Sequence, residues 1–186
     1  TDANVKIVGA LARISVGPDV ATHQALEDIA MLRALPNLTI LVPCDYEETY
    51  KATLAAAAHT GPVYIRITRE KTAIITTKSS SFKIGEASLL RTGKDVTITA
   101  CGPLAYEALL ASEELHKKGI EAEVINMSTI KPIDEKTLLQ SFKKTGCGIT
   151  IEEHQIVGGL FGAVAETLAR NFPAPLESIG MPNTFG

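Results

Sequence analysis

The sequence predicts an α/β protein made of two units, each with a mostly parallel β-sheet. Two observations carry this prediction. Short apolar and β-branched runs of strand length alternate with longer segments of helical periodicity along the whole chain. Such alternation is typical of βαβ units with right-handed crossovers. A polar stretch rich in Ser, Lys and Gly, residues 76–94, interrupts the alternation, and we expect the boundary between the two units there.

The first unit opens with "NVKIVG" (4–9), which reads as a core strand. The segment "HQALEDIAMLRAL" (23–35) has apolar residues at helical spacing and stops before Pro36-Asn37. "LTILVP" (38–43) is continuously apolar, as expected of a strand that is covered on both faces.

A helix and a strand complete this unit. The segment "DYEETYKATLAAAAHTG" (45–61) begins with Asp45 and Glu48 at capping-box spacing and closes at Gly61, so we expect a helix with both ends marked. "PVYIRIT" (62–68) follows as a strand.

The second unit repeats the alternation after a short strand-like stretch, "GEASLLR", inside the polar boundary. Pro103 and Gly119 frame one of its helices, and Asp134 is the expected N-cap of the next. The expected strands are 96–102, 121–127, 148–153 and 176–180, and the expected helices are 103–119, 134–146 and 158–172.

Composition excludes several classes of protein. Hydrophobic residues make up 45% and charged residues 21% of 186 residues, which is typical of a folded chain. The net charge of −3 argues against nucleic-acid binding, and the longest apolar runs are too short to span a membrane. Three widely spaced cysteines without a CxxC argue against a disulfide framework or a zinc site and favour a cytoplasmic location. The sequence also lacks GxGxxG after a first strand, GxxxxGK[ST], HExxH and GxSxG.

Three clusters of polar residues are candidates for chemistry. Asp19 and His23, in "GPDVATHQALED", lie at a loop-to-helix junction, where Asp can cap the turn and a neutral His can bond a substrate hydroxyl or carbonyl. Arg66 and Arg69, in "RITRE", follow a strand, and either they bind a phosphate or carboxylate or they form surface ion pairs.

The third cluster is Glu152-Glu153-His154, followed by Gly158-Gly159 at a helix start. A metal or acid–base cluster is one interpretation. The other is structural, because neighbouring residues on a strand point to opposite faces. The Gly-Gly helix entry either binds an anion or allows tight packing.

Taken together, these stretches resemble the C-terminal part of transketolases, above all the split, two-subunit kind. The resemblance rests on "VGPDVATHQALEDIAMLRALPNLTILVPCDYEET", "PVYIRITRE", "INMSTIKPID", "IEEHQIVGGLFGAVAE" and "IGMPNTFG". It implies that residues 1–75 are the later half of a pyrimidine-binding domain, residues 76–94 a linker and residues 95–186 a transketolase C-terminal domain.

The resemblance also implies a function. Transketolases move a two-carbon ketol unit between sugar phosphates with thiamine diphosphate and a divalent metal, Mg²⁺ or Ca²⁺. By this resemblance Asp19 and His23 bind substrate hydroxyls, His23 is catalytic, and Arg69 binds the substrate phosphate. The implied partner is an N-terminal transketolase subunit or domain, in a homodimer or heterotetramer, and the implied pathway is the pentose phosphate pathway.

This sequence departs from the family pattern at two positions. Leu11 stands where the family usually has a His, and Val20 stands where Gly is common. The family's Glu that bonds the aminopyrimidine ring, and the diphosphate- and metal-binding domain, have no counterpart in these 186 residues. We therefore expect the chain to be inactive alone and to supply substrate contacts within a larger assembly.

Two other functions stay open. One is a related thiamine enzyme, either deoxyxylulose-phosphate synthase or the β subunit of a 2-oxoacid dehydrogenase. The other is a non-catalytic module that only dimerises or docks a partner.

Overall fold

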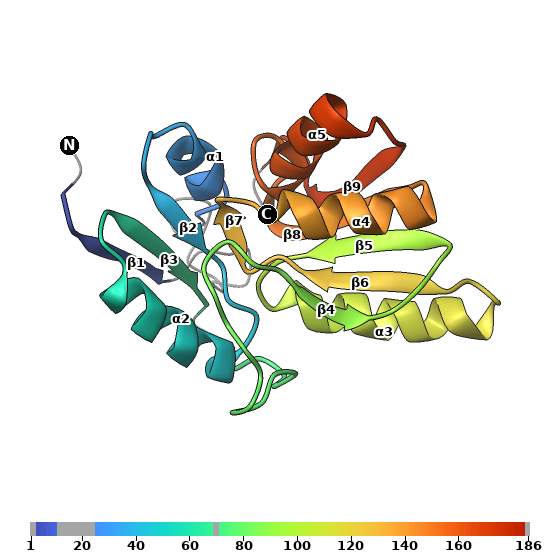
Figure 1. The fold of residues 1–186 in the computed structure, drawn as a ribbon, viewed down its shortest axis with the longest axis horizontal. Coiled ribbons are helices and arrows are strands. Elements are labelled where there is room, and N and C mark those ends of the chain that lie inside the picture. The colour runs from blue at the N-terminus through green and yellow to red at the C-terminus, as the bar shows by residue number, and fades with distance from the viewer. Residues whose placement is uncertain (1–2, 11–24, 69–70, 185–186) are drawn as a thin grey trace.

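The computed structural model describes residues 3–10, 25–68 and 71–184, and it contains two β-sheets that lie side by side (Figure 1). The first sheet has the strand order β1-β3-β2-β7 and the second the order β4-β6-β5-β8-β9. In each sheet one edge strand, β7 or β4, runs antiparallel to its neighbour, and the other pairs are parallel. The predicted α/β fold of two mostly parallel units is confirmed.

The first sheet contains strands from both halves of the chain. Its strands are β1 (Lys6–Ala10), β2 (Thr39–Leu41), β3 (Val63–Ile67) and β7 (Thr129–Lys131). The second sheet consists of β4 (Ser88–Arg91), β5 (Val96–Ala100), β6 (Ala122–Asn126), β8 (Gly148–Gln155) and β9 (Leu176–Met181).

Helices cover both faces of each sheet. The helices are α1 (Asp28–Arg33), α2 (Tyr46–Ala58), α3 (Leu104–Lys117), α4 (Glu135–Thr145) and α5 (Leu160–Asn171). Figure 1 shows α1 and α2 on opposite sides of the first sheet, and α3 on one face of the second sheet with α4 and α5 on the other. No helix in the part of the chain that the structure describes has the length and apolar character needed to span a membrane.

Two predicted caps form as expected. Asp45 accepts a hydrogen bond from the backbone N–H of Glu48 (2.9 Å) at the start of α2, and Asp134 accepts one from Thr137 N–H (2.9 Å) at the start of α4. The Glu48 carboxylate, however, accepts from Cys44 N–H (2.7 Å) and from the amide of Asn126 (2.9 Å). This side chain therefore links α2 to the second sheet as well as to its own helix start.

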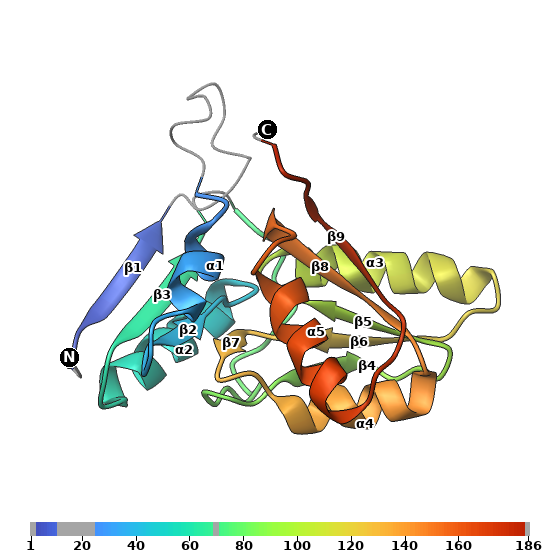
Figure 2. The ribbon, with the colours of Figure 1, turned by 90° about the horizontal axis from the view of Figure 1, so that it is seen from above.

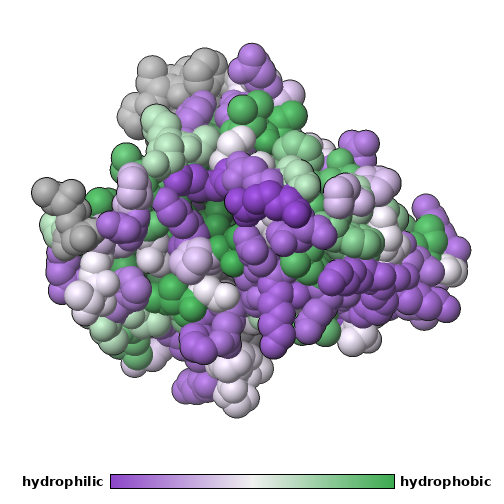
Figure 3. Space-filling model, turned by 45° about the horizontal axis from the view of Figure 1, so that its top comes forward, coloured by the Kyte–Doolittle hydropathy of each residue, from purple (hydrophilic) through white to green (hydrophobic). Residues whose placement is uncertain are grey.

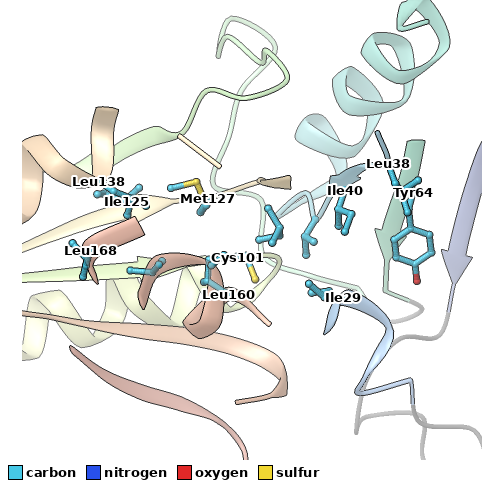
Figure 4. Close-up of a cluster of buried hydrophobic side chains, with 14 of the residues drawn as sticks. Ile29, Leu38, Ile40, Tyr64, Cys101, Ile125, Met127, Leu138, Leu160 and Leu168 are labelled. Carbon is cyan, nitrogen blue, oxygen red and sulfur yellow. The ribbon is translucent and has the colours of Figure 1, made fainter. Parts of the chain in front are cut away.

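One hydrophobic cluster joins the two sheets (Figure 4). It runs from Ile40 on β2, through Ile29 on α1, to Ile125 on β6 and Leu160 on α5, and each of these four side chains has no exposed surface. Burial of this kind is worth about 25 cal/mol per Å² of apolar area. The two units therefore pack together through a shared core.

The prediction of a core strand at 4–9 is right about the strand and wrong about its burial. β1 pairs only with β3 among the described strands, and its apolar side chains are open to solvent, with Ile7 48% and Val8 55% exposed. Apolar composition cannot tell a central strand from an edge strand. On the face of the molecule shown in Figure 3, hydrophobic and hydrophilic side chains are mixed.

The helix predicted at 23–35 begins later than expected. Residues 25–27 lie outside it, and α1 begins at Asp28 and ends at Arg33. Tertiary contacts take the groups that an earlier helical turn would use: Ala25 O accepts from Arg66 (2.9 Å), and Leu26 O accepts from Gln155 N–H (2.8 Å).

Strand β7 was not predicted. It lies within "STIKPID" (128–134) and pairs antiparallel with β2, so it extends the first sheet with residues from the second half of the sequence. Three residues are too few to show a strand periodicity.

All three cysteines are free thiols, two of them buried.

Candidate functional site

The predicted substrate residues Asp19, His23 and Arg69 lie outside the described residues, as do Leu11 and Val20. The described chain on either side of them can nevertheless be located. β1 and β3 are parallel neighbours, and their last residues, Ala10 and Ile67, are register partners. Figure 2 shows both strands pointing to the same edge of the first sheet, close to the start of α1. The described neighbours of all three predicted residues therefore meet at the carboxyl edge of this sheet, where open α/β sheets bind ligands.

Arg66 connects these neighbouring segments. Its side chain is 6% exposed, and its Nε donates to both Asp28 carboxylate oxygens, at 2.9 and 3.2 Å. Its Nη2 donates to Ala25 O at 2.9 Å and to Glu153 O at 3.0 Å. The interpretation of Arg66 as a surface ion pair is therefore wrong, and so is its assignment to a phosphate, because its partners lie within the protein.

Tyr64 completes the polar surroundings of Asp28. Its hydroxyl donates to Asp28 Oδ2 at 2.7 Å. Burial, and then the hydrogen bond to the carboxylate, raise the pKa of the Tyr64 hydroxyl well above its usual value. The phenol thus stays a protonated donor, and Asp28 is held by two partners on β3.

Glu152 and His154 are adjacent on one face of β8, as their two-residue spacing requires. The Glu152 carboxylate accepts from Leu160 N–H (2.6 Å) and Phe161 N–H (2.8 Å) at the start of α5. Burial raises the pKa of Glu152 to about 7, against the opposing effect of these two hydrogen bonds. A Cβ added at Gly159 would lie 2.0 Å from Glu152 Oε2, so glycine is needed there for close packing.

His154 is fully buried beside α1. Ala30 N–H donates to its Nε2 (3.3 Å), and its Nδ1 lies 2.6 Å from Gln155 O, so the hydrogen-bond partners assign the proton to Nδ1. Burial lowers the pKa of the imidazole, which favours this neutral form. His154 therefore links β8 to α1.

These contacts favour the structural interpretation of Glu152-Glu153-His154. Among residues 3–10, 25–68 and 71–184 no group of three His, Cys, Asp or Glu side chains could hold a metal ion. The α5 N–H groups that an external anion would need already bind Glu152. The anion-binding interpretation of Gly158-Gly159 therefore has no support.

A pocket of about 410 Å³ opens at the carboxyl ends of β2 and β3. It was not predicted, although the strands predicted at 38–43 and 62–68 end at its walls. Asp45, in its lining, is already occupied: besides capping α2, it accepts from the N–H groups of Ile75 (2.8 Å) and Thr76 (2.6 Å). The lining residues are Pro43, Cys44, Asp45, Tyr46, Thr49, Ile67, Thr68, Lys71, Thr72 and Ile74.

Thr68 and Lys71, the described residues on either side of residues 69–70, both line the pocket. Burial raises the pKa of the Cys44 thiol well above its usual value, so this residue is a neutral wall rather than a nucleophile. Lys71 is exposed and supplies positive charge at the rim. The end of β3 therefore combines a hollow with a cationic side chain.

Comparison with known families identifies both halves of the chain. The model of the transketolase pyrimidine binding domain matches residues 1–74, and that of the transketolase C-terminal domain matches residues 85–186. The first match covers β1 to β3 and the second covers β4 to β9, so the two family models account for both α/β units of the chain. The chain belongs to the transketolase family.

Individual relatives agree with this assignment. The chain is 44% identical over 183 residues to the 6-deoxy-6-sulfo-D-fructose transketolase subunit SqwH of Clostridium sp. (strain MSTE9), covering 98% of this chain and 57% of that protein. It is 40% identical over 181 residues to an apulose-4-phosphate transketolase subunit of Phocaeicola vulgatus, covering 97% of this chain and 58% of that protein.

A solved structure is also similar. The structure titled "Split gene transketolase, inactive beta4 tetramer" superimposes with a TM-score of 0.92 at 40% identity, covering 99% of this chain and 59% of that one. The chain thus spans a little more than half the length of these relatives.

Proposed function

We propose that this chain is the C-terminal portion of a transketolase, which transfers a two-carbon ketol unit between sugar phosphates once it is assembled with a diphosphate-binding partner. The observation that carries the proposal is the register of β1 with β3, in which Ala10 is opposite Ile67. Together with the bond from Arg66 to Ala25 O, it supports a common site for the segment that holds Asp19 and His23 and for Arg69.

Each proposed residue has a separate role at this edge. Asp19 and His23 bind and orient substrate hydroxyls, and His23 is the catalytic residue among them. Arg69 holds the terminal phosphate, because its planar guanidinium matches the oxygens of a phosphate. This is positioning work, in which small displacements are costly in rate.

Thiamine diphosphate is the cofactor that family membership implies, and when bound it supplies a carbon nucleophile for ketol transfer. Among the described residues no group of three His, Cys, Asp or Glu side chains could hold a metal ion. We propose, as the resemblance implies, that parts outside this chain supply the diphosphate site, the metal site and the ring-bonding Glu.

The proposed partner is the chain or domain that would supply the diphosphate and metal sites. We propose an N-terminal transketolase subunit or domain, in a homodimer or heterotetramer located in the cytoplasm, with residues 1–75 and 95–186 as the two domains and 76–94 as their linker. A relative whose structure is titled an inactive β4 tetramer supports the need for a second kind of chain.

The substrate class is the finer part of the proposal. The two curated relatives are named for a sulfonated ketose and for a sugar phosphate. Both substrates carry a strong anion, which suits an arginine at the end of β3. We propose a phosphorylated ketose donor and an aldose phosphate acceptor, as in the pentose phosphate pathway.

The test is reconstitution with an N-terminal transketolase subunit, thiamine diphosphate and Mg²⁺, followed by a substrate panel. Ketose phosphates with aldose phosphates are expected to react, and the sulfonated ketose is the first comparison. Activity only with pyruvate and glyceraldehyde phosphate, or with a lipoyl acceptor, would assign the chain to a different thiamine enzyme.

Site variants sharpen the same test. Asp19→Ala and His23→Ala are each expected to lower kcat/KM roughly 10- to 100-fold, as the loss of a hydrogen bond to a charged or strongly polar group does. Arg170→Ala, on the exposed surface of α5, is the control and should leave activity unchanged. If both site variants assemble and keep full activity, the chain is a non-catalytic assembly module instead.

A further inference from the structure

We infer that Arg66 is a positioning residue: it holds the backbone at Ala25, which follows the segment that carries Asp19 and His23, against β3 and the second sheet. The inference rests on the proposed function for its consequence in catalysis, and on contacts within the described residues for its geometry. Arg66 itself does not touch substrate in this scheme.

Arg66 joins three segments that are far apart in sequence: β3, on which it lies, residues 25–28, and β8. It donates to Ala25 O, which directly follows the segment that carries Asp19 and His23. It donates to the Asp28 carboxylate at the start of α1 and to Glu153 O on β8. Arg66 thus fixes the backbone on the C-terminal side of that segment relative to the second sheet.

Arg66 is also close in sequence to Arg69. It lies on β3 three residues before Arg69, with one residue of the strand left after it. Its register partner on β1 is Gly9, two residues before position 11. A Cβ at Gly9 would lie 2.0 Å from the Tyr64 hydroxyl oxygen, so β1 lies close against the Tyr64 ring beside the Arg66 network.

The chemistry of the contacts requires an arginine. The acceptors are the Asp28 carboxylate and the carbonyls of Ala25 and Glu153, and the planar guanidinium meets them with donors in fixed directions. A lysine ammonium would offer donors from a single nitrogen and could not reach all three acceptors together.

The cost of burial supports a role in alignment rather than in stability alone. Arg66 and Asp28 are both buried, at 6% and 8% exposure. Such a pair commonly gives no more stability than apolar residues of the same volume. The specific contribution of Arg66 is that it holds Ala25, Asp28 and Glu153 in one arrangement.

Loss of this alignment should affect every donor substrate. Removing Arg69 would weaken only substrates with a terminal anion. Displacement of the Ala25 backbone would instead disturb the residues that bind hydroxyls, which all ketose donors share. A displacement of about 1 Å is enough to lower rates by about 100-fold.

The experiment compares Arg66→Met, Arg66→Lys and the control Lys144→Met in the assembled enzyme, with phosphorylated and non-phosphorylated ketose donors. Lys144 pairs with the buried Glu123, far from this edge, so its loss also breaks an ion pair with a buried carboxylate. Arg66→Met is expected to lower kcat/KM for both donors by a similar factor of at least 10, and Arg66→Lys to restore it only in part. Lys144→Met should leave both KM values unchanged.

A second measurement does not depend on activity. Amide hydrogen exchange in the full chain should rise for Arg66→Met in peptides that cover 25–33 and 151–156, and for Lys144→Met only near α4 and β6. If Arg66→Met lowers the melting temperature but leaves KM, kcat and the exchange of these peptides unchanged, the inference is overturned.

If the wild-type assembly transfers no ketol unit, the proposed function fails. The exchange result then decides alone whether Arg66 ties the three segments together.

Discussion

Two buried carboxylates at the junction of the sheets are stabilised in different ways. Asp28, on α1, lies against the Arg66 guanidinium and the Tyr64 hydroxyl, so its charge is balanced by a cation from β3. Glu152 lies against two backbone N–H groups at the start of α5. Burial nevertheless raises the pKa of Glu152 to about 7. Two backbone hydrogen bonds therefore do not offset the burial of this carboxylate.

The difference has consequences for what each residue does. An ion pair made by residues from distant segments joins those segments, because the loss of either partner leaves the other charge buried and unpaired. A carboxylate held by one helix start mainly orders that helix, and it titrates near neutral pH. Asp28 is thus a link between parts of the proposed site, and Glu152 is a local support.

The largest expected effect comes from breaking the ion pair between Asp28 and Arg66. Asp28→Ala leaves the Arg66 charge buried without a counter-ion, and such losses cost about 3–5 kcal/mol of unfolding free energy. Urea denaturation of the full chain at pH 7 measures this loss of unfolding free energy. Glu135→Ala is the control, because its pair with Arg170 is exposed and worth less than about 1 kcal/mol. A similar small loss for Asp28→Ala would contradict the comparison.

A smaller, pH-dependent effect is expected at Glu152. Because its pKa is raised above the unfolded value of 4.5, the folded state binds more protons between pH 4.5 and about 7, and stability falls as pH rises through this range. The stability of the wild type relative to Glu152→Gln should therefore fall by on the order of 3 kcal/mol from pH 4.5 to 7.5.

His154 provides the opposite control. Its lowered pKa means that the folded state binds fewer protons below pH 6.5, so its contribution to stability is lost as pH falls. Urea denaturation across pH 4.5–7.5 should show stability rising with pH in Glu152→Gln and falling with pH in His154→Gln. Parallel slopes for the two variants would contradict the assignment of these pKa shifts.

Much of the fold follows from local sequence signals. The capped helix α2 and the continuously apolar strand β2 form as predicted, because their signals lie within the elements themselves. The start of α1, the three-residue strand β7 and the exposure of β1 could not be predicted. Each of these depends on residues elsewhere in the chain. Arg66 and Gln155 bind the residues before α1, and β7 forms by pairing with β2. The exposure of β1 follows from its position at the edge of the sheet, where β3 is its single neighbour among the described strands.

The candidate site shows the same division. Asp19, His23 and Arg69 were proposed from a resemblance, and they stay predictions because they lie outside the described residues. The burial of Arg66 was missed, since nothing in "RITRE" distinguishes a buried guanidinium from an exposed one. Its acceptors come from residues 25–28 and from Glu153, and only the fold brings these two segments to β3.

The central proposal is that Arg69 and the hydroxyl-binding residues share one substrate site at the carboxyl edge of the first sheet. It is tested most directly by measuring kcat/KM for Arg69→Ala in the assembled enzyme. Two donors are compared, a ketose phosphate and the same ketose without its phosphate. We expect a loss of roughly 10- to 100-fold for the phosphorylated donor and no change for the non-phosphorylated donor. Equal losses for both donors, or no loss for either, would show that Arg69 does not bind the substrate phosphate at this site.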